Sequence, residues 1–157
     1  MNDFKIFHKP VIKKPFAFGS SAEVYEKMKG YQKADREMFI VLFLNAKNVV
    51  TKIETHSIGS VDVSAVYPYQ IFRSALINNA SSIICVHNHP TGDPKPSNSD
   101  RWITKQISIG SHVIGIRLLD HVVLGDYGRY FSFADDGLIE DYEKECRDKL
   151  NFEFEGV

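Results

Sequence analysis

Cysteine is scarce in this chain of 157 residues, which contains only Cys85 and Cys146. The two thiols lie far apart and form no Cys-x-x-Cys pair, so the sequence favours neither a disulfide framework nor a cysteine-based zinc site. Cys85 belongs to the apolar run at residues 83–86, and we expect it to pack as a small hydrophobic side chain. These observations favour a reducing, cytoplasmic compartment.

An excess of charge of either sign is also missing. Nineteen Lys and Arg residues balance twenty Asp and Glu residues, and the formal net charge is −1. Such a chain has no global electrostatic attraction to phosphate, so nucleic-acid binding is only weakly supported. The charge is uneven, however, because residues 1–15 are mainly basic and residues 135–149 mainly acidic. We interpret these segments as a basic arm and a solvated acidic helix.

Long hydrophobic runs are absent as well. No apolar stretch approaches the length of a membrane span, and the first residues lack the apolar core of a signal peptide, so we expect no membrane partner. The length and the 43% hydrophobic content are typical of one globular domain. Pro10 and Pro15 interrupt the start of the chain. We therefore predict an N-terminal arm at residues 1–18 and a single domain at residues 19–157.

The pattern of apolar residues predicts a mixed β-sheet with helices on its faces, of the α/β (α+β) class. The continuous apolar run at 38–44 is typical of a strand covered on both faces. Further strands are predicted at 49–58, 82–87, 113–119, 122–124 and 130–133. Helices are predicted at about 20–30, at 68–78, from Asn98 or Ser99 to about Gly110, and after Gly137.

The most informative segment is the motif His-x-His-x7-Ser-x2-Asp, which contains His87, His89, Ser97 and Asp100. Alternate residues of a strand point to the same face, about 6.6 Å apart along the chain, so the two imidazoles can reach one metal ion. Pro90 is expected to end the strand, with both rings at its end. Asn88 would face the other way and tie down the following loop.

Asp100 is predicted to lie in the first turn of the next helix and to supply an oxygen ligand. Two nitrogens and one oxygen, with the fourth position left to water, form a catalytic rather than a structural zinc arrangement. Ser97 lies at the mouth of that helix. Its hydroxyl could donate to a carbonyl oxygen that gains negative charge, or it could only cap the helix.

A general base must come from elsewhere in the chain, and spacing alone does not choose among Glu23, Glu37 and Glu54. We interpret Asp93 as a turn residue rather than a fourth ligand. The remaining isolated histidines are interpreted as structural; they are His8, His56 and His112. A His-Asn-His nuclease is not favoured, because nuclease sites of that name gather their residues from separated positions.

With these residues identified, the chain resembles the RadC branch of the JAMM, or MPN-type (JAB), metalloprotease superfamily. The resemblance extends from about Ala34 to Phe133. Its central piece is the segment from His87 to Pro94 together with Pro96, Ser97 and Asp100. The flanking pieces are Arg36-Glu37-x-Phe39, residues 40–45, Ala75-Leu76, Asn79-Ala80, Thr104, residues 118–121 and Ser132-Phe133.

The resemblance implies a cytidine-deaminase-like mixed β-sheet flanked by helices and one bound Zn2+. It implies that His87, His89 and Asp100 are the metal ligands, that Ser97 stabilises the oxyanion and that Glu37 is the catalytic glutamate. Superfamily members hydrolyse amide or isopeptide bonds, notably those made by ubiquitin-like proteins. The pair Asp120-His121 matches a RadC feature, whose role as support behind the ligands or as strand-end structure stays open.

Two departures from the family pattern are visible. The helix-hairpin-helix region of full-length RadC proteins has no counterpart in this length of chain. The family's Pro-Arg-Glu ahead of the central helix is replaced here by Pro68-Tyr69-Gln70. Neither departure affects the metal-binding residues.

Our leading hypothesis is a zinc metallopeptidase or isopeptidase of the JAMM type that acts through a metal-activated water on a protein or peptide substrate. The alternative is a DNA-repair or recombination accessory protein with a structural or vestigial metal site. A nucleotide deaminase shares the implied fold, but its His-x-Glu and Pro-Cys-x-x-Cys motifs are absent. The sequence leaves the oligomeric state open.

Overall fold

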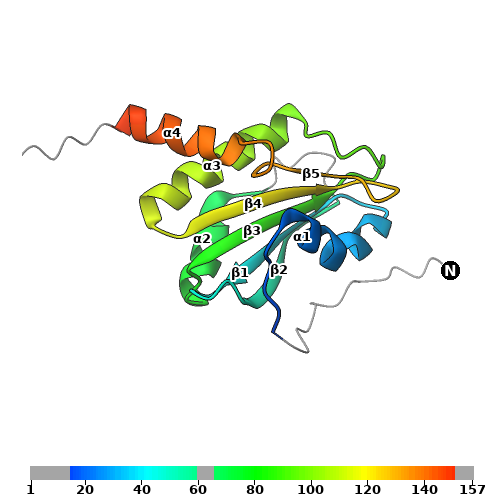
Figure 1. The fold of residues 1–157 in the computed structure, drawn as a ribbon, viewed down its shortest axis with the longest axis horizontal. Helices are drawn as coiled ribbons and strands as arrows, with labels where there is room; N and C mark the ends of the chain where they lie inside the picture. The colour runs from blue at the N-terminus through cyan, green and yellow to red at the C-terminus, as the bar shows by residue number, and fades with distance from the viewer. Residues whose placement is uncertain (1–14, 60–65, 151–157) are drawn as a thin grey trace, which may run out of the picture.

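The computed structural model describes residues 15–59 and 66–150. Its centre is a five-stranded sheet with the strand order β2-β1-β3-β4-β5, flanked by helices (Figure 1). The strands are β1 (Met38–Leu44), β2 (Val50–Ile58), β3 (Ser82–Asn88), β4 (Arg117–Leu124) and β5 (Tyr130–Ser132). The β3–β4 pair is parallel and the other pairs are antiparallel. The predicted mixed sheet flanked by helices is therefore confirmed.

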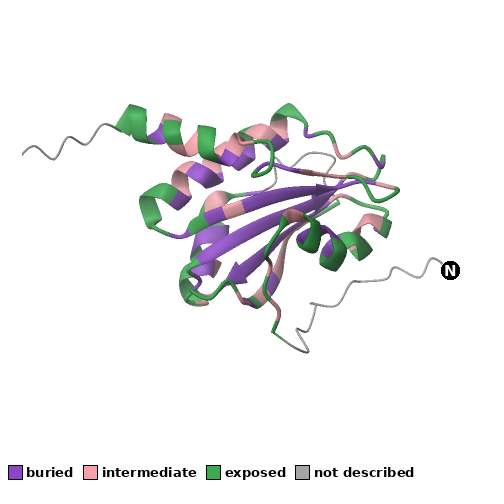
Figure 2. Ribbon diagram, viewed as in Figure 1, coloured by how far each residue is buried: buried purple, intermediate pink, exposed green. Residues whose placement is uncertain are grey.

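Helices cover both faces of this sheet. They are α1 (Ser21–Met28), the 3-10 helix η1 (Lys29–Lys33), α2 (Pro68–Ile77), α3 (Asn98–Ile114) and α4 (Leu138–Leu150). Helices α2, α3 and α4 contribute to one apolar cluster, and α1 contributes to a second cluster on the opposite face. The sheet is thus the middle of three layers, and its central strands are buried (Figure 2).

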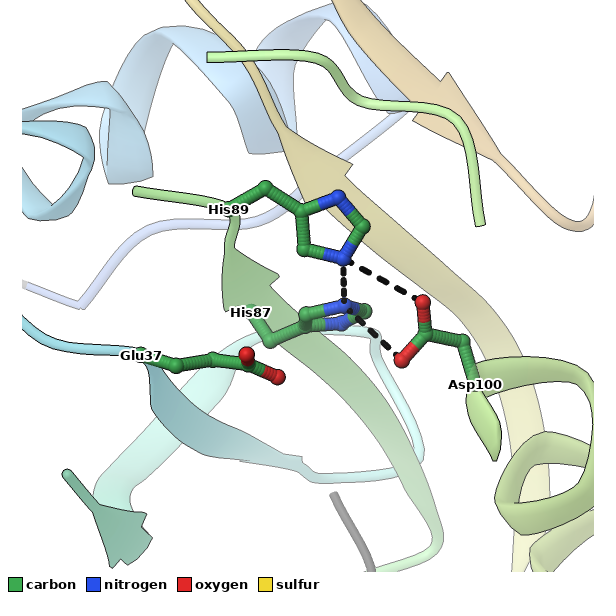
Figure 3. A group of neighbouring side chains, drawn as sticks. All are labelled: Glu37, His87, His89 and Asp100. Atoms are coloured by element: carbon green, nitrogen blue, oxygen red, sulfur yellow. Dashed lines mark hydrogen bonds and ion pairs between the residues drawn. The ribbon is translucent and has the colours of Figure 1, made fainter. Parts of the chain in front are cut away.

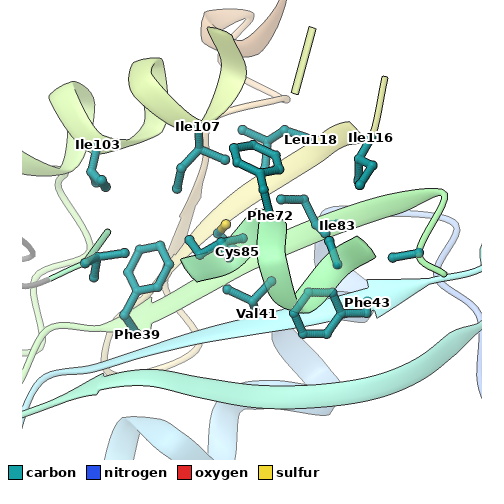
Figure 4. Close-up of a cluster of buried hydrophobic side chains, with 14 of the residues drawn as sticks. Phe39, Val41, Phe43, Phe72, Ile83, Cys85, Ile103, Ile107, Ile116 and Leu118 are labelled. Carbon is teal, nitrogen blue, oxygen red and sulfur yellow. The ribbon is translucent and has the colours of Figure 1, made fainter. Parts of the chain in front are cut away.

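Strand β1 shows why the apolar run at 38–44 has no polar alternation. All seven of its residues are buried. Phe39, Val41 and Phe43 pack toward α2 and α3, and the residues between them pack toward α1 (Figure 4). Cys85 of β3 is fully buried in the first of these clusters, as expected from its apolar neighbours.

Helix α3 is longer than predicted, and the two strands predicted after it are one. Gly110 does not end α3; the helix continues to Ile114, and Gly115, at φ +80°, ends it. Gly110 is small for a packing reason, because a Cβ atom there would lie 2.5 Å from Cε2 of Phe72 on α2. The predicted strand start at Val113 is therefore wrong, and β4 is a single strand from Arg117 to Leu124.

The predicted N-terminal arm lies largely outside the described residues, which begin at Pro15. Within the described part, the carbonyl of Phe16 accepts a hydrogen bond from Val50 N–H at 2.8 Å, and Ala17 forms an antiparallel bridge with Val49. The division into an arm and one domain stays a prediction. None of the described helices is long and apolar enough to cross a membrane.

Candidate metal centre

Four side chains from three segments of the chain meet at the end of β3. One ligand atom each from Glu37, His87, His89 and Asp100 lies within 4.8 Å of all the others. Figure 3 shows the two imidazoles next to each other at the strand end, with Asp100 approaching from α3 and Glu37 from the residue just before β1; the planes of the two rings are at 61°. We call these four residues the metal cluster.

The two histidines converge in the way that strand geometry predicts. Strand β3 ends at Asn88, directly before the two residues His89 and Pro90. The Nε2 atoms of His87 and His89 are 3.0 Å apart. His87 is fully buried, whereas the side chain of His89 is 16% exposed, so the cluster has a deep end and a solvent-facing end.

The start of α3 places the carboxylate of Asp100. Ser97 and Asp100 form a capping box, in which Ser97 Oγ accepts from Asp100 N–H at 3.1 Å and Asp100 Oδ2 accepts from Ser97 N–H at 2.6 Å. The same carboxylate lies 3.2 Å from both histidines, Oδ1 from His87 Nε2 and Oδ2 from His89 Nε2. The motif that begins the helix therefore also aims the oxygens at the imidazoles.

Ser97 is the helix cap and keeps a proton to donate. Its hydroxyl uses a lone pair to accept from Asp100 N–H, and within the described residues it has no acceptor for its own O–H. Ser97 is exposed at the mouth of the cluster. Capping and donation to a substrate oxygen, which the sequence presented as alternatives, are therefore compatible.

The loop between His89 and Ser97 is held down at its glycine. Gly92 has φ +81°, and a Cβ atom there would collide with the Asp126 carboxylate. Gln32 of η1 donates through Nε2 to the His89 carbonyl at 2.9 Å and to Asp126 Oδ1 at 3.1 Å. These contacts fix the loop that joins the two halves of the motif.

Of the three glutamates that spacing left open, only Glu37 belongs to the metal cluster. Glu23 accepts a hydrogen bond from Gly19 N–H at 2.8 Å, and Glu54 is paired with Lys52 at 3.1 Å. Glu37 is next to His89, and its charge acts to raise the pKa of that imidazole. The geometry thus agrees with the residue that the family resemblance indicated.

The cluster is electrostatically coupled. Burial lowers the pKa of His87 despite the nearby Asp100 carboxylate. Burial also acts to lower the pKa of His89, but hydrogen bonds to Asp100 and to the Asp93 carbonyl outweigh it and raise that pKa. For Asp100 burial acts to raise the pKa, and the hydrogen bonds with both histidines hold it well below its usual range. An ionised carboxylate beside two imidazoles is the result.

The donor set fits a divalent metal ion. His89 Nδ1 lies 2.7 Å from the Asp93 carbonyl oxygen, which can only accept, so the ring proton is on Nδ1 and the Nε2 lone pair faces the cluster. That lone pair meets His87 Nε2 and the carboxylate of Asp100. Nitrogen and carboxylate acceptors that converge in this way could hold a divalent cation, and this combination is typical of zinc sites.

Comparison with known proteins agrees with this geometry. The sequence profile of the RadC-like JAB domain matches residues 18–138, well over half of the chain. The chain belongs to the RadC-like JAB domain family. Residues 87–100 of this RadC-like JAB domain, which carry most of the metal cluster, lie inside the matched region.

The RadC-like chain is also similar to proteins named UPF0758. It is 44% identical to one from Methanosarcina mazei over 117 residues, 74% of this chain and 49% of that protein. It is 45% identical to one from Clostridium acetobutylicum over 116 residues, 74% of this chain and 49% of that protein. A third, from Shouchella clausii, is 43% identical over 130 residues, 82% of this chain and 54% of that protein. The chain therefore spans about half the length of these curated relatives.

Two supporting residues of this RadC-like domain were not predicted in their observed roles. Asn88 was expected to tie down the loop after His89, but its hydrogen bonds are to a different segment. It is fully buried, accepts from Met38 N–H at 2.8 Å and donates to the Arg36 carbonyl at 3.0 Å, so it grips the backbone on both sides of Glu37. Gln32 was not singled out at all, because a glutamine in a short polar helix has no sequence signal.

The other polar residues weighed from the sequence lie outside the metal cluster. Asp93 is a turn residue, as predicted, and its Oδ1 accepts from Lys95 N–H at 3.1 Å. His112 is exposed, and His56 packs against Phe43, with its ring centroid 6.4 Å away. His8 lies outside the described residues.

Asp120, the first residue of the Asp120-His121 pair, joins β4 to the end of β5 and to the residues that follow it. It accepts from Ser132 Oγ at 2.7 Å and from Ala134 N–H at 2.9 Å. Burial raises the pKa of this carboxyl to about 6. Asp120 therefore has a structural role at the strand end.

Proposed function

We propose that this RadC-like JAB domain is a zinc-dependent hydrolase of peptide or isopeptide bonds. The proposal is carried by one observation, the convergence of His87, His89, Asp100 and Glu37 within 4.8 Å at a strand end that is partly open to solvent. His87 Nε2, His89 Nε2 and the Asp100 carboxylate would hold the ion. When bound there, zinc would polarise a carbonyl group and make a coordinated water more acidic.

Glu37 is the residue that we assign to proton transfer. Its carboxylate would take a proton from the attacking water and deliver it to the nitrogen of the departing group. Because Asn88 fixes the backbone before and after Glu37, the carboxylate starts from a rigid position beside His89. Such support matters because displacing a catalytic group by about 1 Å can cost about 100-fold in rate.

Ser97 is assigned to the substrate oxygen. Its hydroxyl proton is not used in the capping box, so it can donate to the carbonyl oxygen as negative charge builds up there. Since Asp100 N–H and Ser97 Oγ are locked in the capping box, the direction of the hydroxyl is set by the helix start.

The substrate class that fits this chemistry is a peptide or a protein conjugate, including those made by ubiquitin-like proteins. Both cysteines are buried and free, which supports our proposal that the protein works in the reducing cytoplasm. The alternative, a DNA-associated accessory role, rested on the basic arm. Because residues 1–14 lie outside the described part, that alternative stays a prediction.

The test is turnover of a panel of peptide and isopeptide substrates by the zinc-loaded chain and by Glu37→Gln. Glu37→Gln should keep its zinc and lose about 100- to 10,000-fold in kcat, the range expected for a lost general acid–base group. Glu54→Gln is the matched control, since it removes a carboxylate that lies outside the metal cluster. Full activity of Glu37→Gln with zinc bound would refute the assigned base, and wild-type inactivity on every substrate would refute the hydrolase.

A further inference from the structure

His121 is a fully buried histidine that is not a member of the metal cluster. It lies on β4, stacked against Phe133 with ring centroids 5.0 Å apart and planes at 8°, and its ring centroid is 5.3 Å from that of Phe39 in a T-shaped arrangement. Two polar groups reach the ring. His87 Nδ1 lies 2.7 Å from His121 Nε2, and Thr104 Oγ1 lies 2.6 Å from His121 Nδ1.

The directions of these hydrogen bonds follow from a single backbone carbonyl. Thr104 Oγ1 donates to the carbonyl oxygen of Asp100 at 2.5 Å, and a carbonyl oxygen can only accept. The hydroxyl has one proton, which this bond uses. Thr104 Oγ1 must therefore accept from His121, so the ring proton of His121 is on Nδ1.

The position of the proton on His121 also determines the position of the proton on His87, a proposed metal ligand. The hydrogen-bond partners of the His121 ring among the described residues are His87 and Thr104, and neither is a carboxylate that would favour a second ring proton. With its one proton on Nδ1, His121 offers the Nε2 lone pair to His87. His87 Nδ1–H then donates to it, and His87 Nε2 is left as a lone pair facing Asp100 and His89.

We infer that His121 and Thr104 are positioning residues that hold His87 in the tautomer whose Nε2 binds the metal. This inference rests on the proposed metal site. The hydrogen bonds form a chain that begins at one proposed ligand, His87, and ends on the backbone carbonyl of another, Asp100. Phe39 and Phe133 keep the His121 ring in place between them.

The two proposed histidine ligands reach the same tautomer by different means. His89 follows the end of β3, and the Asp93 carbonyl of the adjoining loop accepts its Nδ1 proton. His87 lies within β3, which pairs with β1 on one side and β4 on the other, so the nearby backbone carbonyls are engaged in the sheet. A side chain must supply the acceptor there, and His121 supplies it.

The experiment uses the full chain and two measurements that need no turnover. Zn2+ affinity is measured by competition with a chromophoric chelator, and the imidazole tautomers of the metal-free protein are read from long-range 1H–15N correlation spectra at about pH 8, above the ordinary histidine pKa. His121→Phe keeps an aromatic ring between Phe39 and Phe133 but removes both nitrogens. His121→Gln returns an amide oxygen that can accept from His87.

His56→Phe is the matched control. It replaces a half-buried histidine that packs against a phenylalanine, and its buried Nε2 has no hydrogen-bond partner among the described residues. Both variants therefore lose an imidazole, but only His121→Phe loses the contact with His87.

We expect the wild-type chain to show His87 protonated on Nδ1. His121→Phe should bind Zn2+ about 10- to 100-fold more weakly, the usual cost of removing a partner behind a ligand, and its His87 should show a mixture of tautomers. His121→Gln should recover most of the affinity, and His56→Phe should bind as the wild type does. Thr104→Val should also weaken binding, because it leaves the His121 Nδ1 proton without an acceptor.

The inference is overturned if folded His121→Phe binds Zn2+ like the wild type with the same His87 tautomer, or if wild-type His87 carries its proton on Nε2. If His121→Phe does not fold, Thr104→Val decides instead, and wild-type Zn2+ affinity with an unchanged His87 tautomer in that folded variant would overturn the inference. Failure of the hydrolase proposal is separate, since a chain that binds zinc and turns over no substrate still reports on the tautomer. A chain that binds no Zn2+ ends the metal site, and the metal-free spectra then decide whether His121 sets the tautomer.

Discussion

Among the described residues, histidine and carboxylate side chains gather in the metal cluster and in a second cluster, and only the first of these is a candidate metal site. The second, which we call the Glu54 cluster, contains Lys52, Glu54, His56 and Ser74. In it, Lys52 Nζ lies 3.1 Å from Glu54 Oε2, and Ser74 Oγ donates to Glu54 Oε1 at 3.1 Å.

The difference lies in the source of positive charge. Glu54 is neutralised by a lysine of its own strand, whereas the ion-pair partners of Asp100 in the described residues are two imidazoles. Imidazoles whose second nitrogen is already bonded elsewhere present lone pairs to the carboxylate, as His89 does. A group of acidic and imidazole side chains is therefore a metal-site candidate when its acceptors converge without a built-in cation, and composition alone does not distinguish the two cases.

Removing one carboxylate from each cluster should give the largest contrast. Asp100→Asn takes away the charged oxygen ligand, so its Zn2+ affinity should fall by more than the roughly 100-fold upper range for loss of a partner behind a ligand. Glu54→Gln should bind Zn2+ as the wild type does. Isothermal titration with Zn2+ measures both, and equal affinities for the two variants would contradict the assignment of Asp100 as a ligand.

Removing the hydroxyl of Ser97, beside the metal cluster, or that of Ser74, in the Glu54 cluster, should affect the catalytic rate differently and leave metal affinity unchanged in both cases. Ser97→Ala should lower kcat about 100- to 1000-fold with zinc retained, because it removes the proposed donor to the substrate oxygen. Ser74→Ala should leave kcat unchanged.

Loss of the helix cap must be separated from this effect. Ser97→Ala should also destabilise the fold by about 0.5–2 kcal/mol through α3, and Ser20→Ala, which removes the serine cap of α1, should destabilise by a similar amount. Urea unfolding gives these values. If Ser20→Ala lowered kcat as much as Ser97→Ala, the rate loss would reflect stability and not oxyanion stabilisation.

In the metal-free chain, the pKa values of His89 in the metal cluster and His56 in the Glu54 cluster should be shifted in opposite directions. Burial lowers the pKa of His56, whereas the hydrogen bonds to Asp100 and Asp93 raise the pKa of His89 above its ordinary value despite burial. A raised folded-state pKa means that protonated His89 contributes stability at low pH, which is lost as the pH rises through that pKa. Histidine NMR titration should therefore show His89 protonating at higher pH than His56.

Zinc should abolish the His89 titration and leave that of His56 in place, because metal and proton compete for the same Nε2 lone pair. Zn2+ affinity should accordingly fall as the pH drops through the folded pKa of His89. A His89 titration that persists unchanged in excess zinc would show that the ring is not a ligand.

The smallest effect is expected from removing the built-in cation of the Glu54 cluster. Lys52→Met should change the free energy of unfolding by less than about 1 kcal/mol, since the pair is partly exposed. Burial acts to raise the pKa of Glu54, and hydrogen bonds from Lys52 and Ser74 lower it, so that pKa should rise in the variant. Urea unfolding and carboxyl NMR titration measure the two quantities, and an unfolding change well above 1 kcal/mol would mean that the pair is structural.

The parts of the site that the sequence predicted are those set by local geometry. The alternation of β3 placed His87 and His89 on one side, and the first turn of α3 brought Asp100 back to them across a short loop. Glu37 could not be chosen from spacing, because its position depends on the antiparallel register that pairs Phe39 with His87. The family resemblance, rather than periodicity, selected it among the three glutamates.

Contacts between segments that are distant in the chain also explain where the predictions from the sequence were wrong or incomplete. Gly110 was interpreted as a helix end because glycine commonly ends helices, whereas its role is to admit the ring of Phe72. The predicted role of Asn88 was wrong because its hydrogen bond with Met38 joins residues 50 apart in the chain. The sequence left the role of His121 open between support behind the ligands and strand-end structure, because this residue reaches His87 through the parallel pairing of β3 with β4, which no local pattern encodes.

The distance along the chain between the proposed ligands and the proposed base has a consequence for assembly. His87, His89 and Asp100 lie within fourteen consecutive residues, whereas Glu37 joins them only after β1 has docked against β3. Closing the short loop between the two histidines and Asp100 costs less chain entropy than bringing in Glu37, so a partly folded chain could bind an ion before Glu37 reaches its place. Under the proposed function, ion capture would need only residues 87–100, whereas turnover would also need β1 in place beside β3.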